Sequence, residues 1–225
     1  YGQAAEDCKL QHVTAKSGRL DGKTFDKRFW QKKPVVFRNL TAGWPASSAW
    51  ADREGFLRRH GGLTVGLREQ VVLGSFDQSR RDVTVREYLT GDTHRHLIQF
   101  SFGDLGLYRA LRPDYSPLPE ALRRTSYTPA FSLGRNGTGS GGHRHEENWL
   151  AQLAGRKAWL LAPPPGAGGA DEAPPSEALP PCEHWDSARR RLWPRGAVSC
   201  VVGPGEVIYI PNGWYHATCN LDDFT

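Results

Sequence analysis

The chain of 225 residues contains no methionine and only four cysteines, Cys8, Cys182, Cys200 and Cys219. None of them forms a C-x-x-C pair, which excludes the usual structural zinc modules and thioredoxin-type redox motifs. No run of eighteen apolar residues is present, so the sequence as given contains no membrane span. The glycine-rich stretch 137–142 lacks a following Gly-Lys-Ser/Thr, which excludes a phosphate-binding P-loop.

Charge points to no particular partner. The formal net charge is +5 and the pI is about 9.1, a balance compatible with nucleic-acid binding. The basic residues are interpreted as scattered, however, and no nucleic-acid-binding motif accompanies them. The short run 189–191 of three arginines is interpreted as a solvated loop. We therefore expect no nucleic-acid partner, and the sequence does not indicate the oligomeric state.

Glycine, proline and aromatic residues are what the sequence has in abundance. The 25 glycines and 16 prolines imply many turns, while eight Trp, nine Phe and seven Tyr favour a strand-rich interior. A length of 225 residues with 38% hydrophobic content is sufficient for one core. We predict one domain over residues 1–225, mainly β with flanking helices.

Hydrophobic spacing predicts the following elements. A helix capped by Thr24 presents Phe25, Phe29 and Trp30 on one face and ends before Pro34. The further expected elements are a buried strand at 35–37, helices at 52–59 and 84–89, a helical turn at 108–112, and strands at 96–100 and 127–133. Residues 1–95 are expected to form a support layer, and residues 96–225 the strand-rich body.

Three histidines form the most informative pattern. His143 and His145 are spaced to point to one face of an extended strand. His216 follows 71 residues later, so folding must bring it to the pair. Metal sites with three protein ligands on one face leave the opposite face open for substrate and oxygen. We predict that His143, His145 and His216 bind a metal ion.

The residues after the pair make this interpretation specific. Residues 148–164 read as a strand, a tight glycine turn, a second strand and a proline stop. The run N-x-x-x-Q-x-x-G-x-K-x-x-x-L-x-x-P-P begins at Asn148, and G-E-x-x-x-x-P-x-x-W-x-H ends at His216. Together they resemble the jumonji-C oxygenases, which use Fe(II) and 2-oxoglutarate. The similarity covers roughly residues 20–225 and includes an opening helix and strand at 25–44.

The resemblance implies a fold, a reaction and a set of binding residues. The fold is a double-stranded β-helix, the jelly roll of cupin-like proteins, with a loop insertion at 163–197 and a further strand expected beyond residue 225. Lys157 would pair with the distal carboxylate of 2-oxoglutarate, and Ser140 and Asn148 would lie beside the same cosubstrate. The implied reaction is hydroxylation of a polypeptide side chain.

His145 departs from the family pattern, which normally has Asp or Glu at this position. A subgroup of small jumonji-C proteins of the endoplasmic reticulum lumen is similar in carrying H-x-H. A one-residue slip would instead let Glu147 pair with His145 in the usual H-x-E spacing. Two other functions also stay open: a cupin-like protein that acts by binding partners, and a three-histidine dioxygenase that uses no 2-oxoglutarate.

The four cysteines permit two disulfides or four buried thiols. Cys8 and Cys200 match positions where the lumenal relatives carry Cys, which would tie the N-terminal arm to the barrel. Two glycosylation sequons begin at Asn39 and Asn136 and are compatible with a secretory route. We expect the endoplasmic reticulum lumen or the secretory pathway, with the cytoplasm as the alternative. Trp185 and Trp193 in the insertion either contact a peptide or anchor the loop.

Overall fold

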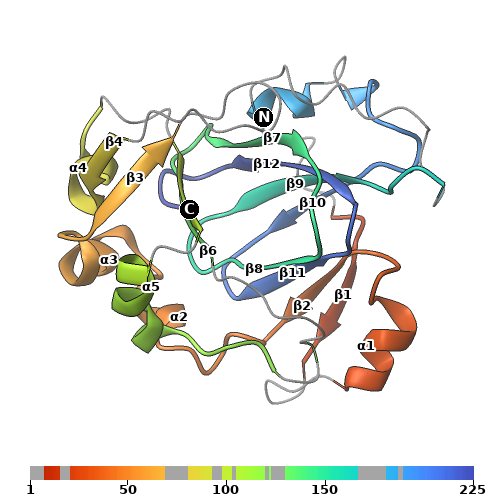
Figure 1. Ribbon diagram of the computed structural model, residues 1–225, viewed down its shortest axis with the longest axis horizontal. Helices are drawn as coiled ribbons and strands as arrows, with labels where there is room; N and C mark the ends of the chain where they lie inside the picture. The colour runs from red at the N-terminus through yellow and green to blue at the C-terminus, as the bar shows by residue number, and fades with distance from the viewer. Residues whose placement is uncertain are drawn as a thin grey trace.

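Two four-stranded sheets face each other and form a jelly-roll barrel in the computed structural model (Figure 1). The residues that the structure describes are 8–15, 21–68, 81–92, 98–102, 105–119, 122, 130–166, 181–186 and 190–225. The first sheet has the order β1-β2-β11-β8 and consists of β1 (Gln11–Thr14), β2 (Val35–Arg38), β11 (Glu206–Ile210) and β8 (Asn148–Ala151). The second has the order β10-β9-β12-β7 and consists of β10 (Val198–Val202), β9 (Lys157–Ala162), β12 (Tyr215–Asn220) and β7 (Gly139–His143).

Strands with apolar side chains on both faces lie between the barrel interior and an outer layer of packed residues. In β2, Val36 contacts the barrel interior, whereas Val35 and Phe37 pack on the outside against Phe25 and Phe29. Helix α1 (Gly22–Arg28) carries Phe25 and covers this outer face. Burial of such side chains at both faces contributes about 2 kcal/mol per residue and fixes these strands in the middle of the structure.

The outer face of the second sheet is covered by the chain from the insertion. The 3-10 helix η3 (Pro181–Trp185) lies against β7 and β12, and a disulfide joins Cys182 to Cys219 of β12. Trp185 and Trp193 are buried in the same outer cluster. These two tryptophans therefore anchor the insertion to the barrel.

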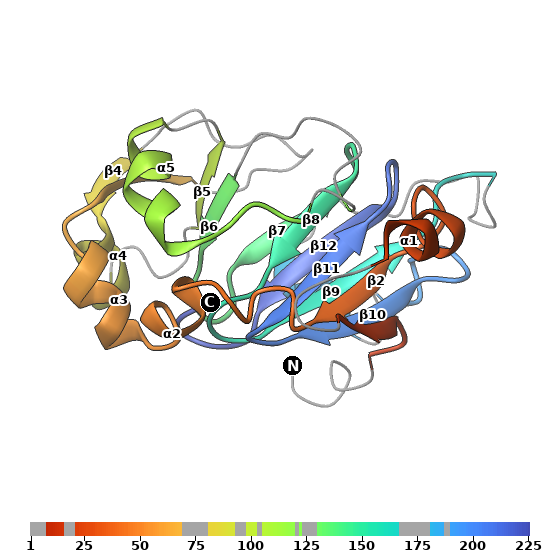
Figure 2. The ribbon, with the colours of Figure 1, turned by 90° about the horizontal axis from the view of Figure 1, so that it is seen from below.

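A third sheet, of order β4-β3-β5-β6, stands at the end of the molecule opposite to α1 (Figures 1 and 2). Its strands are β3 (Thr64–Arg68), β4 (Arg81–Thr84), β5 (Ile98–Phe102) and β6 (Ala130–Leu133). The remaining helices are α2 (Ala46–Ala49), α3 (Arg53–His60), α4 (Val85–Thr90), α5 (Leu105–Leu111) and the 3-10 turn η1 (Arg112–Asp114). These helices and the third sheet share a hydrophobic core that is separate from the barrel interior. No described helix has both the length and the apolarity needed to cross a membrane.

The predicted boundary at residue 95 does not follow the sheets. β1 and β2 belong to the barrel, whereas β5 and β6 pair within the third sheet. The prediction failed here because strand pairing across the barrel depends on contacts far apart in the sequence, such as Val36 with Ile208. The predicted strands at 96–100 and 127–133 overlap β5 and β6, and their residues 96–97 and 127–129 lie outside the described residues.

One local detail differs from expectation, and a second extends the predicted strand, glycine turn and strand at 148–164. Asp21, not Thr24, caps α1, because its carboxylate accepts hydrogen bonds from the N–H groups of Lys23 and Thr24. The strands on either side of Gly155 are not paired with each other: β8 pairs with β11, and β9 pairs with β10 and β12. Gly155 has a φ of 59°, and a Cβ there would meet the Phe224 carbonyl, so the turn between the sheets requires glycine.

Candidate metal centre

His143 and His216 are brought side by side by the pairing of β7 with β12. His143 ends β7 and is the register partner of His216, while Ser140 is the partner of Thr218. An advance of three residues along β7 therefore corresponds to an advance of two residues along β12. This mismatch is a β-bulge, with one extra residue in β7. Because side chains alternate along a strand, the extra residue is what turns both Ser140 and His143 to the inner face.

His145 lies in the connection from β7 to β8 and is not part of a strand. The expectation that one strand presents both histidines of the pair was therefore wrong: β7 ends at His143, where the chain must turn toward the first sheet. The N–H of Gly213 donates to the His145 carbonyl at 3.0 Å, which holds this connection against the turn before β12. His216 is buried, His143 is half-buried, and His145 is the most exposed of the three.

The three imidazoles converge. Ring centroids are 5.3 Å apart for His143 and His145, 4.3 Å for His143 and His216, and 4.7 Å for His145 and His216. One ring nitrogen of each lies within 4.8 Å of the others. That spacing is compatible with three ligands around one metal ion at about 2 Å each.

Hydrogen bonds fix the tautomer of all three rings. The Nδ1 atoms of His143, His145 and His216 lie 2.8, 2.7 and 2.9 Å from the carbonyl oxygens of Gly141, Glu146 and Trp214. A carbonyl oxygen can only accept, so each Nδ1 carries the proton and each Nε2 keeps a lone pair. Donation from the second ring nitrogen to a backbone carbonyl is the arrangement that orients metal-binding histidines.

The surroundings also favour the neutral form of His143 and His216. Burial holds the pKa of His216 well below its usual range, and the neighbouring His143 and His145 lower it further. Burial likewise lowers the pKa of His143, against the opposing effect of its hydrogen bond to Gly141. Metal binding requires deprotonated Nε2 atoms, so these rings are prepared for it near neutral pH.

Glu147 is turned away from the histidines. Its Oε2 accepts hydrogen bonds from Gln31 Nε2 at 3.0 Å and from the Tyr209 hydroxyl at 3.2 Å. Tyr209 packs against Phe25 and Trp149 on the outer face of the first sheet. The described residues thus bring together three histidines, and the alternative pairing of Glu147 with His145 is not formed.

A second group of possible metal ligands among the described residues has a different explanation. Cys8, His12 and Cys200 lie close together, but the two sulfurs are joined in a disulfide. The bond ties the N-terminal arm to β10 at the barrel interior. It matches the pairing implied by the family resemblance.

Lys157 lies on the same inner face, deeper in the barrel. It begins β9 and pairs in register with Asn220 of β12 and Val202 of β10. It is 4% exposed, and no described residue forms a hydrogen bond or ion pair with its ammonium group. Burial lowers its pKa to about 8. A buried cation without a partner costs several kcal/mol, so this position favours a bound anion.

Ser140 and Asn148 both reach the interior. The backbone N–H of Ser140 donates to Thr218 Oγ1 at 2.9 Å. In the sheet, this pair of residues lies between the histidines and Lys157. Asn148 begins β8, and alternation places it on the face of Leu150, which packs against the interior cluster.

Two buried polar atoms were missed from the sequence. Trp159 Nε1 and Asn220 Oδ1 have no hydrogen-bond partner among the described residues. The Trp159 ring lies 5.9 Å from that of His216. Alternate residues of a strand share one face, so Trp159 lies on the face of Lys157, two residues before it, and Asn220 on the face of His216, four residues before it. The sequence could therefore have identified both residues. These atoms and the Lys157 ammonium offer hydrogen-bonding capacity that a dicarboxylate could use.

Fold and site together define a double-stranded β-helix protein with a candidate metal centre of three histidines. Residues 108–225 match the family described as cupin-like domain. JmjC domain-containing protein 8 of Mus musculus is 30% identical over 211 residues, covering 84% of this chain and 71% of the mouse protein. The arginine-specific demethylase JMJ22 of Arabidopsis thaliana is 27% identical, covering 85% of this chain and 40% of that protein. The chain therefore belongs to the cupin-like family of jumonji-C domain proteins.

Solved structures agree on the fold. The ribosomal oxygenase YcfD of Escherichia coli matches with a TM-score of 0.52 at 17% identity, covering 91% of this chain and 49% of that one. A second YcfD structure gives a TM-score of 0.53, also at 17% identity, with 92% and 50% coverage. The chain thus spans about half the length of these solved structures. The predicted double-stranded β-helix is confirmed.

Proposed function

We propose that this chain is an Fe(II)- and 2-oxoglutarate-dependent oxygenase that hydroxylates a polypeptide side chain. The observation that carries the proposal is the set of three imidazoles, each with Nδ1–H on a backbone carbonyl and with one ring nitrogen of each within 4.8 Å of the others. Relatives named as a bifunctional arginine demethylase and lysyl-hydroxylase, psr-1, and as a ribosomal oxygenase support the reaction class.

The residues present fit an iron ion and a dicarboxylate. His143, His145 and His216 would hold the metal, leaving its opposite face open. Three neutral imidazoles leave the Fe(II) charge of about +2 on the site, whereas two imidazoles and a carboxylate would leave about +1. A doubly charged 2-oxoglutarate would balance this excess.

Lys157 would bind the far carboxylate of the cosubstrate. Its ammonium has no described partner and lies in an interior where an unpaired charge is costly and a paired one is tolerated. Ser140 and Asn148 face the same barrel interior from β7 and β8 and would orient the cosubstrate. The apolar side chains of Val36, Ile208 and Ile210 exclude water from the opposite wall.

Bound iron and 2-oxoglutarate would supply the oxidising chemistry: the cosubstrate and O₂ become succinate and CO₂, and one oxygen atom enters a substrate C–H bond. The protein's part is to bind these groups, hold their orientation and keep water out. The implied substrate is a polypeptide side chain positioned at the open end marked by His145.

Anaerobic titration tests the proposal. Fe(II) followed by 2-oxoglutarate should produce a metal-to-ligand charge-transfer band in visible light that requires both additions and is absent from Lys157→Met. A band that forms without 2-oxoglutarate dependence would contradict cosubstrate binding. Succinate formation above that of a His143→Ala/His216→Ala control would then establish turnover.

His145 in place of an acidic ligand favours one alternative, a cupin-like protein that acts by binding partners. The same titration separates the two. Metal binding without any effect of 2-oxoglutarate would support the partner-binding protein or a three-histidine dioxygenase, and succinate release would exclude both.

We also propose an oxidising compartment, the endoplasmic reticulum lumen or the secretory pathway. The support is that all four cysteines are paired in disulfides, Cys8 with Cys200 and Cys182 with Cys219, a state that cytosolic reductants oppose. Asn39 and Asn136 of the two sequons are exposed. Thiol titration of the denatured, unreduced protein from its native source should find no free thiol, and four free thiols would contradict the assignment.

A further inference from the structure

One exposed segment has a marked local excess of positive charge, although basic residues also lie on many other parts of the surface. Residues 22–33 carry five basic side chains against one acidic, which accounts for +4 of the formal net charge of +5. These basic residues, which together with Trp30 we call the basic face, are Lys23, Lys27, Arg28, Lys32 and Lys33, and all are exposed. Asp21, just before them, is engaged in capping α1.

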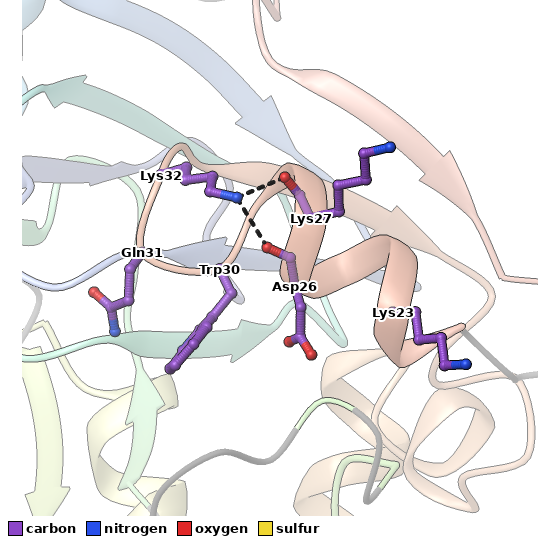
Figure 3. A pocket seen from close by; sticks show the side chains of 6 residues that line it. All are labelled: Lys23, Asp26, Lys27, Trp30, Gln31 and Lys32. Atoms are coloured by element: carbon purple, nitrogen blue, oxygen red, sulfur yellow. Dashed lines mark hydrogen bonds between the residues drawn. The ribbon is translucent and has the colours of Figure 1, made fainter.

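Trp30 gives the basic face an apolar contact. It is 36% exposed, and Trp30 and Leu192 are the exposed large hydrophobic side chains among the described residues. An open hollow of about 640 Å³ is lined by Lys23, Asp26, Lys27, Trp30, Gln31 and Lys32. Figure 3 shows the side chains of these residues. The Lys32 ammonium donates to the carbonyls of Asp26 and Lys27 at 3.2 and 2.7 Å, so the end of α1 is held in place.

Hydrogen bonds connect the residue after Trp30 to the β7–β8 connection that carries His145. Gln31, next to Trp30, has a φ of 54°, an uncommon conformation for a residue other than glycine. Its backbone N–H donates to the Tyr209 hydroxyl at 3.2 Å, and its side chain donates to Glu147. Glu147 belongs to the connection that carries His145. These hydrogen bonds place the turn after α1 beside the connection that carries His145.

We propose that the basic face docks an acidic segment of the polypeptide substrate, next to the residue that enters the histidine centre. The proposal rests on the proposed function and specifies its substrate class. Lys23, Lys27 and Arg28 would pair with carboxylates, while Trp30 would contact an apolar side chain between them.

The acidic residues near this surface favour a polypeptide over a nucleic acid. Asp26 lines the hollow, and Glu146 and Glu147 belong to the connection that carries His145. A phosphodiester backbone carries one negative charge at every nucleotide and would be repelled there. A polypeptide can place acidic residues opposite the lysines and neutral or basic ones opposite Glu146. We therefore expect acidic residues on one side of the modified side chain and none immediately beside it.

Binding of labelled peptides tests the docking without any need for turnover. Fluorescence anisotropy would compare a fluorescein-labelled peptide of alternating Glu and Ala with the matching peptide of Gln and Ala. We expect the Glu peptide to bind at least about tenfold more tightly, and Lys23→Glu/Lys27→Glu to remove this preference. Trp30→Ala should weaken binding by about fivefold or more. Equal affinity for the two peptides would overturn the proposal.

A matched control separates this surface from overall charge. Arg58→Glu/Arg81→Glu makes the same change of charge at exposed positions on α3 and β4. This variant should retain the preference for the Glu peptide. An equal loss in both double variants would show non-specific attraction and would contradict the docking site. Tighter binding of oligo-U RNA or of phosphatidylserine vesicles than of the Glu peptide would do the same.

The outcome distinguishes the docking site from the oxygenase function. Peptide binding that depends on Lys23 and Lys27, in a protein that never releases succinate, would support the docking site and contradict the oxygenase. Succinate release with a peptide substrate that is unaffected by Lys23→Glu/Lys27→Glu would support the oxygenase and overturn the docking site.

Discussion

The two walls of the barrel interior differ in chemistry. The inner face of the sheet β10-β9-β12-β7 carries the polar residues His143, His216, Thr218 and Lys157. Trp159, Leu161, Cys200 and Val202 of the same sheet join the apolar interior cluster. The facing sheet β1-β2-β11-β8 presents the apolar side chains Val36, Leu150, Ile208 and Ile210. The sheet β10-β9-β12-β7 thus provides nearly all of the residues that could bind a metal ion or a cosubstrate. The sheet β1-β2-β11-β8 excludes water from the interior.

This difference explains why costly groups persist in the polar wall. Unpartnered buried polar atoms, such as Trp159 Nε1 and Asn220 Oδ1, each cost about 1–3 kcal/mol. The apolar wall supplies part of the compensating stability, because Val36, Ile208 and Leu150 are register neighbours across three strands. Substitutions in the two walls should therefore have opposite consequences for binding and for stability.

The largest expected effect follows removal of a ligand from the polar wall. His143→Ala or His216→Ala should weaken Fe(II) binding by about a hundredfold or more and abolish succinate formation. His145→Ala should act in the same direction. Anaerobic Fe(II) titration measures this, with Arg144→Ala as the neighbouring exposed control.

Glu147→Gln tests whether Glu147 is a ligand of the metal centre. Because Glu147 bonds to Gln31 and Tyr209, this variant should bind Fe(II) as the wild type does. A loss equal to that of His145→Ala would show that Glu147 is the third ligand in solution.

The apolar wall should respond in stability alone. Ile208 is fully buried in the interior cluster, so Ile208→Ala should lower the free energy of unfolding by about 2–5 kcal/mol. Fe(II) affinity of the folded variant should change little, since Ile208 contributes no ligand. Urea denaturation and the Fe(II) titration check the two halves, and a loss of metal affinity comparable to that of His143→Ala would contradict the separation of the walls.

Lys157→Met should weaken 2-oxoglutarate binding and yet stabilise the protein without cosubstrate. Loss of a charge-assisted contact should raise the dissociation constant by about 10- to 100-fold. Removal of the buried, unpaired ammonium should raise the free energy of unfolding by about 3 kcal/mol, since burial lowers the pKa from 10.5 to about 8. Titration calorimetry and urea denaturation measure the two effects.

Arg156→Met is the matched control for Lys157→Met. Arg156 precedes β9, is exposed and pairs with Asp222. Its loss should cost about 0–1 kcal/mol and leave cosubstrate binding unchanged. Destabilisation by Lys157→Met in the absence of 2-oxoglutarate would show that the ammonium has a partner within the protein.

The sequence was sufficient for the parts of the molecule with a local or motif-based signature. The pattern around His143, Lys157 and His216 identified the family, and spacing predicted the helices near 52–59 and 84–89, where the structure has α3 and α4. Asp52 and Thr84 cap these helices through their own side chains, so the signal lies within a few residues.

Features that depend on distant pairing were beyond the sequence. The bulge that turns His143 inward exists only opposite β12, and the place of β2 in the barrel depends on β11. The direction of Glu147 is set by Tyr209, 62 residues away. The basic face was missed for a different reason: charge was judged over the whole chain, whereas the local excess over residues 22–33 appears only when α1 and the turn after it are considered alone.

A pH dependence should also come from Lys157. Its folded pKa of about 8 lies below the unfolded value of 10.5, so between these values the unfolded state binds more protons. Stability of the protein without cosubstrate should therefore rise as the pH increases from about 8 to about 10, and the advantage of Lys157→Met should shrink over the same range. Affinity for 2-oxoglutarate should fall by up to about tenfold for each pH unit above 8, because binding requires the charged ammonium. Denaturation of wild type and Lys157→Met across this range measures the difference, and a constant difference would mean that Lys157 titrates elsewhere.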